Sequence, residues 1–171
     1  RHMRAARNQY APMQGVPALR EAIAGKYEEI HGRRYDPETE VTVTSGGTEA
    51  IFDAVTAVLH PGEEAIVLEP CYDSYIPGIE MSGGAPVIVP LQYPDYSVDW
   101  PAVRAAITAK TRLLIINTPH NPAGAVLTST DIQELIASVK GTDLVIVSDE
   151  VYEDIIFDGV EHESMGRHPE L

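Results

Sequence analysis

Four short, continuous apolar runs constrain the fold of this chain more than any other feature. They lie at residues 65–68, 87–89, 113–116 and 144–147. Such runs are typical of strands that are covered on both faces, as in parallel sheets. Helical segments are expected around them, near residues 17–31, 48–59, 73–82, 101–108 and 129–140. The alternation predicts an α/β fold in which helices lie on both faces of a mostly parallel sheet.

The two ends of the chain carry weaker signals. Residues 41–44 (Val-Thr-Val-Thr) predict a further strand before a glycine turn, whereas the tail after Phe157 is polar and shows no pattern. The chain begins Arg-His-Met and ends without a closing strand. We therefore expect a fragment of a larger protein, in which residues 1–40 form an N-terminal segment and helix that lead into a partial domain over residues 41–171.

Composition excludes several classes of function. The 171 residues are 44% hydrophobic and carry a formal net charge of -14, which argues against nucleic acid or an anionic membrane surface as a partner. No apolar run approaches the roughly 18 to 20 residues that a membrane-spanning helix needs. The single cysteine, Cys71, excludes an internal disulfide framework. We expect a cytoplasmic protein.

Polar clusters directly follow the predicted strands. They are Ser45 to Thr48, Glu69 to Tyr72, Asn117 to Pro122 and Ser148 to Tyr152. In open parallel sheets the ligand crevice lies outside the carboxyl ends of the strands, so these clusters are expected to converge at one edge.

Each cluster has a functional and a structural interpretation. The glycine turn at a helix start suits a phosphate, but it also fits an ordinary turn with Thr48 as the cap. Tyr72 suits stacking on a planar ligand or plain packing. The two asparagines at 117 and 121 suit ligand binding or turn formation. Asp149 favours function, because a carboxylate that follows a buried strand is costly to desolvate without a cation or donor.

Five ordered motifs resemble the class I and II aminotransferases of the pyridoxal phosphate (PLP) fold type I, the aspartate aminotransferase superfamily. The motifs are Asn8-Gln9-Tyr10 with Gly15, Ser45 to Ala50, Tyr72, Asn117 to Gly124 and Asp149 to Tyr152. Within that family they look closest to the methionine and kynurenine (glutamine-phenylpyruvate type) transaminases. The resemblance covers nearly the whole chain and implies the large, cofactor-binding domain of such an enzyme, in incomplete form.

The resemblance implies pyridoxal 5'-phosphate as the cofactor and assigns roles by position. Gly47 and Thr48, with Gly46 nearby, would hold the phosphate, and Tyr72 would stack on the pyridine ring. Asp149 would pair with the pyridine nitrogen and keep it protonated, which makes the ring an electron sink.

Four further residues match positions of the family. Asn121 and Tyr152 would hydrogen-bond the 3-oxygen of the ring, and Asn117 would lie near the substrate carboxylate. Tyr10 resembles the residue that reaches the phosphate of the neighbouring subunit. The resemblance therefore implies a homodimer with shared sites that acts on an amino acid and a 2-oxo acid.

The resemblance also calls for a Schiff-base lysine downstream of the Asp-x-x-Tyr motif. The only lysines are Lys26, Lys110 and Lys140, and none stands at a matching position. The arginine for the substrate carboxylate belongs to a C-terminal small domain, which we expect to be absent here. We therefore assign no catalytic residue and no metal ligand, and expect these 171 residues alone to be inactive.

Three functions remain open at this point. The first is PLP-dependent transamination by the parent enzyme, with this chain as its cofactor-binding core. The second is a PLP-dependent carbon-sulfur β-lyase, which uses the same cofactor-binding motifs. The third is a non-catalytic, truncated module that keeps the fold.

Overall fold

Residues 3–6 and 9–171 are described by the computed structural model, in which the chain divides into two units, Arg1–Ser45 and Gly46–Leu171. The first unit contains a short 3-10 helix (Met3–Ala5) and helix α1 (Pro17–His31). Pro17 begins α1, where its missing N–H is not needed. The N–H of Gly32 donates to the carbonyl of Glu28 at 2.9 Å and ends the helix, which confirms the predicted range.

The predicted strand at residues 41–44 is wrong. This segment has no regular secondary structure. The N–H of Val43 donates to the carbonyl of Gln14 at 2.9 Å, so the segment pairs with a loop of the same unit. Alternating Val and Thr favour an extended backbone, but a strand also needs a neighbour with which to form a ladder.

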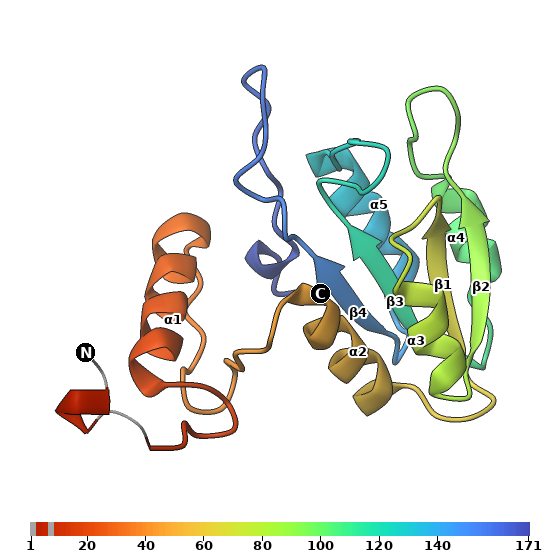
Figure 1. The fold of residues 1–171 in the computed structure, drawn as a ribbon. Coiled ribbons are helices and arrows are strands. Elements are labelled where there is room, and N and C mark those ends of the chain that lie inside the picture. Colours follow the sequence, from red (N-terminus) through yellow and green to blue (C-terminus); the bar gives the residue numbers. More distant parts are fainter. Residues whose placement is uncertain (1–2, 7–8) are drawn as a thin grey trace. The chain divides into compact units, whose positions relative to one another are not determined.

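The second unit contains one four-stranded sheet in the order β2-β1-β3-β4, with all neighbouring strands parallel (Figure 1). The strands are β1 (Glu64–Glu69), β2 (Ala85–Pro90), β3 (Thr111–Asn117) and β4 (Val145–Asp149). The chain runs from β1 outward to β2 and then returns past β1 to β3. The carboxyl ends of β1 and β3 are thus the switch point at which a crevice forms in sheets of this kind.

Four helices complete the second unit: α2 (Gly47–Val58), α3 (Tyr75–Met81), α4 (Trp100–Ala106) and α5 (Ser129–Val139). The helices α2 and α3 cover one face of the sheet, and α4 and α5 cover the other (Figure 1). All four strands and all four helices match the predicted segments, with ends that differ by at most two residues. The predicted α/β class is confirmed.

Alternate strand residues supply the two cores, because successive side chains of a strand point to opposite faces. In β1, Ile66 and Leu68 pack with α4 and α5, whereas Ala65 and Val67 pack with α2 and α3. The neighbouring residues of β3 alternate in the same way, and residues 113–116 are at most 2% exposed. This two-sided burial explains why β1 and β3 were visible as unbroken apolar runs.

A hydrogen bond to a buried tryptophan joins the starts of helices α4 and α5. Asp131 forms a capping box with Thr128 at the start of α5. Its other carboxylate oxygen accepts a hydrogen bond from the indole Nε1 of Trp100 at 3.0 Å. The start of α4 is therefore fixed to the start of α5.

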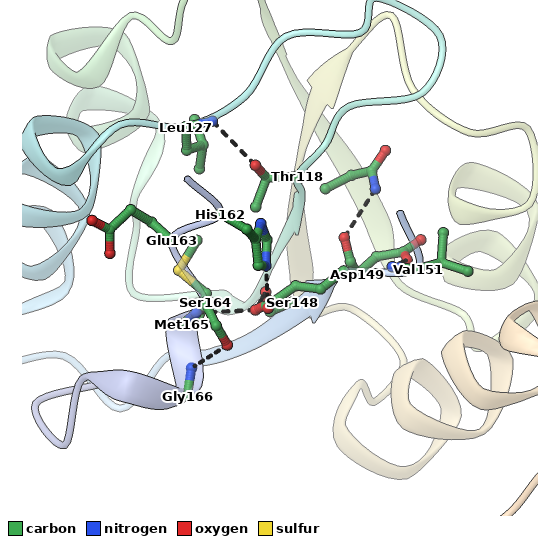
Figure 2. Close-up of polar contacts among 12 residues, drawn as sticks. Thr118, Leu127, Ser148, Asp149, Val151, His162, Glu163, Ser164, Met165 and Gly166 are labelled. Atoms are coloured by element: carbon green, nitrogen blue, oxygen red, sulfur yellow. Dashed lines mark hydrogen bonds and ion pairs between the residues drawn. The ribbon is translucent and has the colours of Figure 1, made fainter. Parts of the chain in front are cut away.

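The tail after Phe157 contributes to the core in spite of its polar sequence. It forms no strand, but Met165, in a short 3-10 helix (Met165–Arg167), is buried in the core under α4 and α5. Glu150 holds this segment. Its Oε1 accepts from Ser148 Oγ at 2.6 Å and from the N–H of Met165 at 3.0 Å, and its Oε2 lies 2.8 Å from His162 Nε2. Figure 2 shows Ser148, His162, Ser164 and Met165 close together beside the end of β4.

None of the helices in the described ranges is both long enough and apolar enough to cross a membrane.

We predict that Gly84→Ala destabilises the second unit by about 1 to 3 kcal/mol, because overpacking forces neighbours to move. An added Cβ would lie 2.8 Å from Cγ of Leu59 and closer still to its Cδ2, and Leu59 is buried. Urea unfolding followed by circular dichroism gives the midpoint. Gly78→Ala is the control, because its Cβ would meet only Phe52 at 3.9 Å, inside α3. Equal midpoints for the two variants would contradict the prediction.

We predict that Glu150→Ala lowers the free energy of unfolding by about 3 kcal/mol, because three part-buried hydrogen-bonding groups lose their shared partner. Glu134→Ala is the matched control. Glu134 pairs with Arg104 at 2.8 Å, but both side chains are at least 40% exposed, so its loss is expected to cost under about 1 kcal/mol. Chemical denaturation of both variants measures the difference.

Candidate functional site

A cavity of about 160 Å³ opens at the carboxyl ends of the strands in the second unit. It is lined by Gly47, Thr48, Ile51, Tyr72, Asn117, Asn121, Asp149, Val151 and Tyr152. Seven of these nine were singled out from the sequence, and only Ile51 and Val151 were not. The polar clusters that follow β1, β3 and β4 therefore converge with the start of α2, as the strand-end argument predicts.

Two predicted residues do not line this cavity. Gly46 directly precedes the lining residue Gly47. Tyr10 belongs to the first unit, where its side chain is fully exposed, so its role toward a neighbouring subunit stays a prediction. Asn8, the first residue of the same motif, lies outside the described residues.

The start of α2 is built to receive an anion. Gly46 occupies the N-cap position with φ +96°, a left-handed conformation that favours glycine. No side chain caps the helix, so the interpretation of Thr48 as the cap is wrong. A Cβ added at Gly46 or Gly47 would meet nothing within 4 Å. Both glycines therefore leave room for a ligand beside the first turn of α2, where the helix dipole suits a phosphate.

The aromatic side chain of Tyr72 lies beside the start of α2. The hydroxyl of Tyr72 lies 3.2 Å from Thr48 Oγ1, and either group can donate. The ring of Tyr72 meets the ring of Tyr75 edge-on, with centroids 5.7 Å apart and an interplanar angle of 75°. Tyr72 is therefore fixed at its hydroxyl by Thr48 and at its ring by Tyr75.

Asp149 ends β4 and is fixed by several hydrogen bonds. Its Oδ2 accepts from the hydroxyl of Tyr75 at 2.6 Å, and its Oδ1 accepts from the N–H of Val151 at 3.3 Å. Its backbone carbonyl accepts from Asn117 Nδ2 at 2.9 Å and from the N–H of Thr118 at 3.1 Å. The carboxylate therefore faces the cavity in a defined orientation.

Tyr75 was not among the residues predicted from the sequence to form the site. Its side chain is 2% exposed and does not line the cavity. Burial raises the pKa of the Tyr75 phenol far above its usual value, and the hydrogen bond to Asp149 and the charge there add to the effect. The phenol is therefore a permanent donor. Tyr75 is the first residue of α3 and lies further from the end of a strand than the polar clusters, so its sequence position does not mark it.

The loop after β3 is held mainly by its own polar side chains. Asn117 Oδ1 accepts from the N–H of Asn121 at 2.7 Å. Thr118 Oγ1 accepts from the N–H of Leu127 at 3.1 Å, as Figure 2 shows. Since Nδ2 of Asn117 also donates to the backbone carbonyl of Asp149, both polar atoms of this side chain hold the loop in place. This geometry agrees with the turn-forming interpretation of Asn117.

His120 joins this loop to the one that follows β1, and sequence reasoning missed it. The imidazole is buried and hydrogen-bonds the backbone of Pro70, while its Nδ1 lies 3.4 Å from the N–H of Ala123. Burial lowers the pKa of His120, and the hydrogen bond to Pro70 opposes this effect. A neutral imidazole, with one donor and one acceptor nitrogen, satisfies both contacts.

The donors and acceptors of the cavity fit one kind of ligand. An anionic group suits the start of α2, a flat ring suits Tyr72, and a protonated nitrogen suits Asp149. Among the described residues that line the cavity there is no lysine.

Comparison with known proteins agrees with this reading. The model of the family "Aminotransferase class I and II" matches residues 1–170. The chain belongs to this family. The methionine aminotransferase of Escherichia coli K12 is 45% identical over 170 residues, which cover 99% of this chain and 44% of that protein. A probable N-succinyldiaminopimelate aminotransferase of Mycobacterium tuberculosis is 48% identical over 158 residues, 91% of this chain and 40% of that protein.

A solved structure of the class I and II aminotransferases has the same fold. It is an Escherichia coli protein for which a methionine aminotransferase function was identified, and it superposes with a TM-score of 0.95 at 45% identity. The match covers 98% of this chain and 44% of that one. The chain thus spans less than half the length of these relatives.

We predict that Cys71, which neighbours the cavity residue Tyr72, alkylates slowly in the folded chain. Burial, followed by the charges of Glu69 and Asp73, raises the pKa of the Cys71 thiol. The reactive thiolate is then scarce near pH 8, and the rate should keep rising above the usual thiol range. Iodoacetamide labelling followed by mass spectrometry measures the rate, which should increase several-fold in urea. Equal rates for folded and unfolded protein would refute it.

Proposed function

We propose that this chain is the cofactor-binding core of a pyridoxal 5'-phosphate-dependent aminotransferase, which transfers an amino group between an L-amino acid and a 2-oxo acid. The observation that carries the proposal is that Asp149, the ring of Tyr72 and the glycine-containing start of α2 line the same cavity. Membership of the aminotransferase family supports it. On this proposal residues 41–171 belong to the large domain of the enzyme.

The start of α2 binds the phosphate in this proposal. The N–H groups of Gly47 and Thr48 donate to its oxygens, and Gly46 gives the backbone the turn that exposes them. The hydroxyl of Thr48 supplies a further donor beside Tyr72. A dianionic group gains from the helix dipole at this position.

Tyr72 and Asp149 orient the pyridine ring. The Tyr72 ring packs against its flat face, and the carboxylate of Asp149 holds a proton on the ring nitrogen by a charge-assisted hydrogen bond. When bound, the cofactor supplies an electron-withdrawing ring that stabilises negative charge on the α-carbon of an amino acid. The task of Asp149 is to keep the ring in its protonated, more electron-withdrawing form.

The remaining lining residues complete the proposed site. Asn121 and Tyr152 hydrogen-bond the 3-oxygen of the ring, and Asn117 lies near the substrate carboxylate. We further propose a cytoplasmic homodimer in which Tyr10 reaches the phosphate of the neighbouring subunit. Because the two relatives above are named for different substrates, we propose the class of reaction and no particular amino donor.

We predict that Asp149→Asn weakens the binding of pyridoxal 5'-phosphate by about 10- to 100-fold, because a hydrogen bond between charged groups becomes a neutral one. Equilibrium titration of the protein that contains this chain, followed by absorbance, gives the dissociation constant. The same preparation is assayed for transfer of an amino group from amino acids to a 2-oxo acid.

Asp53→Asn is the matched control, since Asp53 is exposed on α2 and does not line the cavity. It should bind the cofactor as the wild type does. The proposal fails if the wild-type protein shows no saturable binding, or if both variants bind equally well. Release of pyruvate from a cysteine conjugate without amino transfer would favour the β-lyase.

A further inference from the structure

We propose that Tyr75 is a positioning residue that fixes both the carboxylate of Asp149 and the ring of Tyr72 from behind the cavity wall. This inference rests on the proposed function, because it assigns the orientation of two groups that would hold the cofactor ring. It concerns a side chain that does not itself line the cavity.

The hydrogen bond to Asp149 is the first contact that supports the proposal. The hydroxyl of Tyr75 donates to Asp149 Oδ2 at 2.6 Å and joins residues that are 74 positions apart in the chain. Rotation about the last bond of an aspartate side chain is soft, with broad minima. A short donor on one oxygen, together with the Val151 N–H on the other, removes that freedom.

The carboxylate keeps enough acceptor capacity for a ligand. An ionised carboxylate offers about four lone-pair sites. Tyr75 and Val151 donate to one site on each oxygen, which leaves a second site on each. Because Asp149 lines the cavity, its unused sites are available to a protonated ring nitrogen.

The ring of Tyr75 provides the second contact. It meets Tyr72 edge-on, the arrangement that aromatic pairs prefer, with centroids 5.7 Å apart. The hydroxyl of Tyr72 reaches Thr48 at 3.2 Å. Tyr75 therefore contacts both Asp149 and Tyr72. This one buried side chain sets the distance between the carboxylate and the ring of Tyr72.

The burial of Tyr75 suits this role. The side chain is 2% exposed inside α3, so its ring does not swing away without disturbing the core against the sheet. Burial and the neighbouring carboxylate raise the pKa of the Tyr75 phenol, so it remains a donor across the range in which the protein is handled.

The test compares two ligands in Tyr75→Phe, which removes the hydroxyl and keeps the ring. The ligands are pyridoxamine 5'-phosphate, which has no aldehyde to react with lysines, and its analogue with C–H in place of the ring nitrogen. Only the first ligand can use the carboxylate of Asp149. We expect Tyr75→Phe to weaken the first ligand about tenfold in calorimetric titration and the analogue less than about twofold.

Tyr93→Phe is the matched control, because Tyr93 is 84% exposed and loses the same hydroxyl. It should leave both affinities unchanged. Equal weakening of both ligands by Tyr75→Phe would mean a general structural role and would overturn the proposal, as would no weakening of either.

A double-mutant cycle tests the contact without any ligand. Tyr75→Phe, Asp149→Ala and the double variant are unfolded in urea, and we expect a coupling of about tenfold in the unfolding equilibrium constant. An absence of coupling overturns the proposal whatever the protein binds. A wild-type protein that does not distinguish the two ligands would refute the proposed function, whereas the cycle still decides whether Tyr75 holds Asp149.

Discussion

The burial of both faces of a parallel sheet is the constraint on which the second unit depends. Since β1 and β3 send alternate side chains into two cores, helices must cover both faces, and each connection must return over the sheet. All four strands then end at the same edge. The polar residues that follow them are brought together by this topology, although they are separated by up to about 80 positions in the sequence.

Much of this arrangement was predictable because its signals are local. The apolar runs marked the strands, and the glycine turn marked the start of α2. Asp149 and Tyr72 could be found because each comes within a few residues of the end of an apolar run. Tyr75 could not, because its hydrogen bond to Asp149 joins two elements whose register the sequence does not reveal. Residues 41–44 misled the prediction because their strand propensity finds no partner strand.

The cavity takes its shape from hydrogen bonds between loops more than from the sheet alone. His120 joins the loop after β3 to the backbone at Pro70, and Asn117 joins it to the end of β4. At the end of β4, the carboxylate of Glu150 forms hydrogen bonds with Ser148, His162 and the backbone of Met165. Adjacent acidic residues thus have separate tasks, since Asp149 faces the cavity and Glu150 anchors the tail.

The contact between Trp100 and Asp131 has a practical consequence for spectroscopy. Trp100 is the only tryptophan of the chain, it is 5% exposed, and it lies in the core under α4 and α5, on the sheet face opposite α2. Its fluorescence emission therefore reports the integrity of that core. Because Tyr72 and the start of α2 belong to the other face, a shift in the emission wavelength of this single fluorophore reports a change in that core and not a direct contact in the cavity.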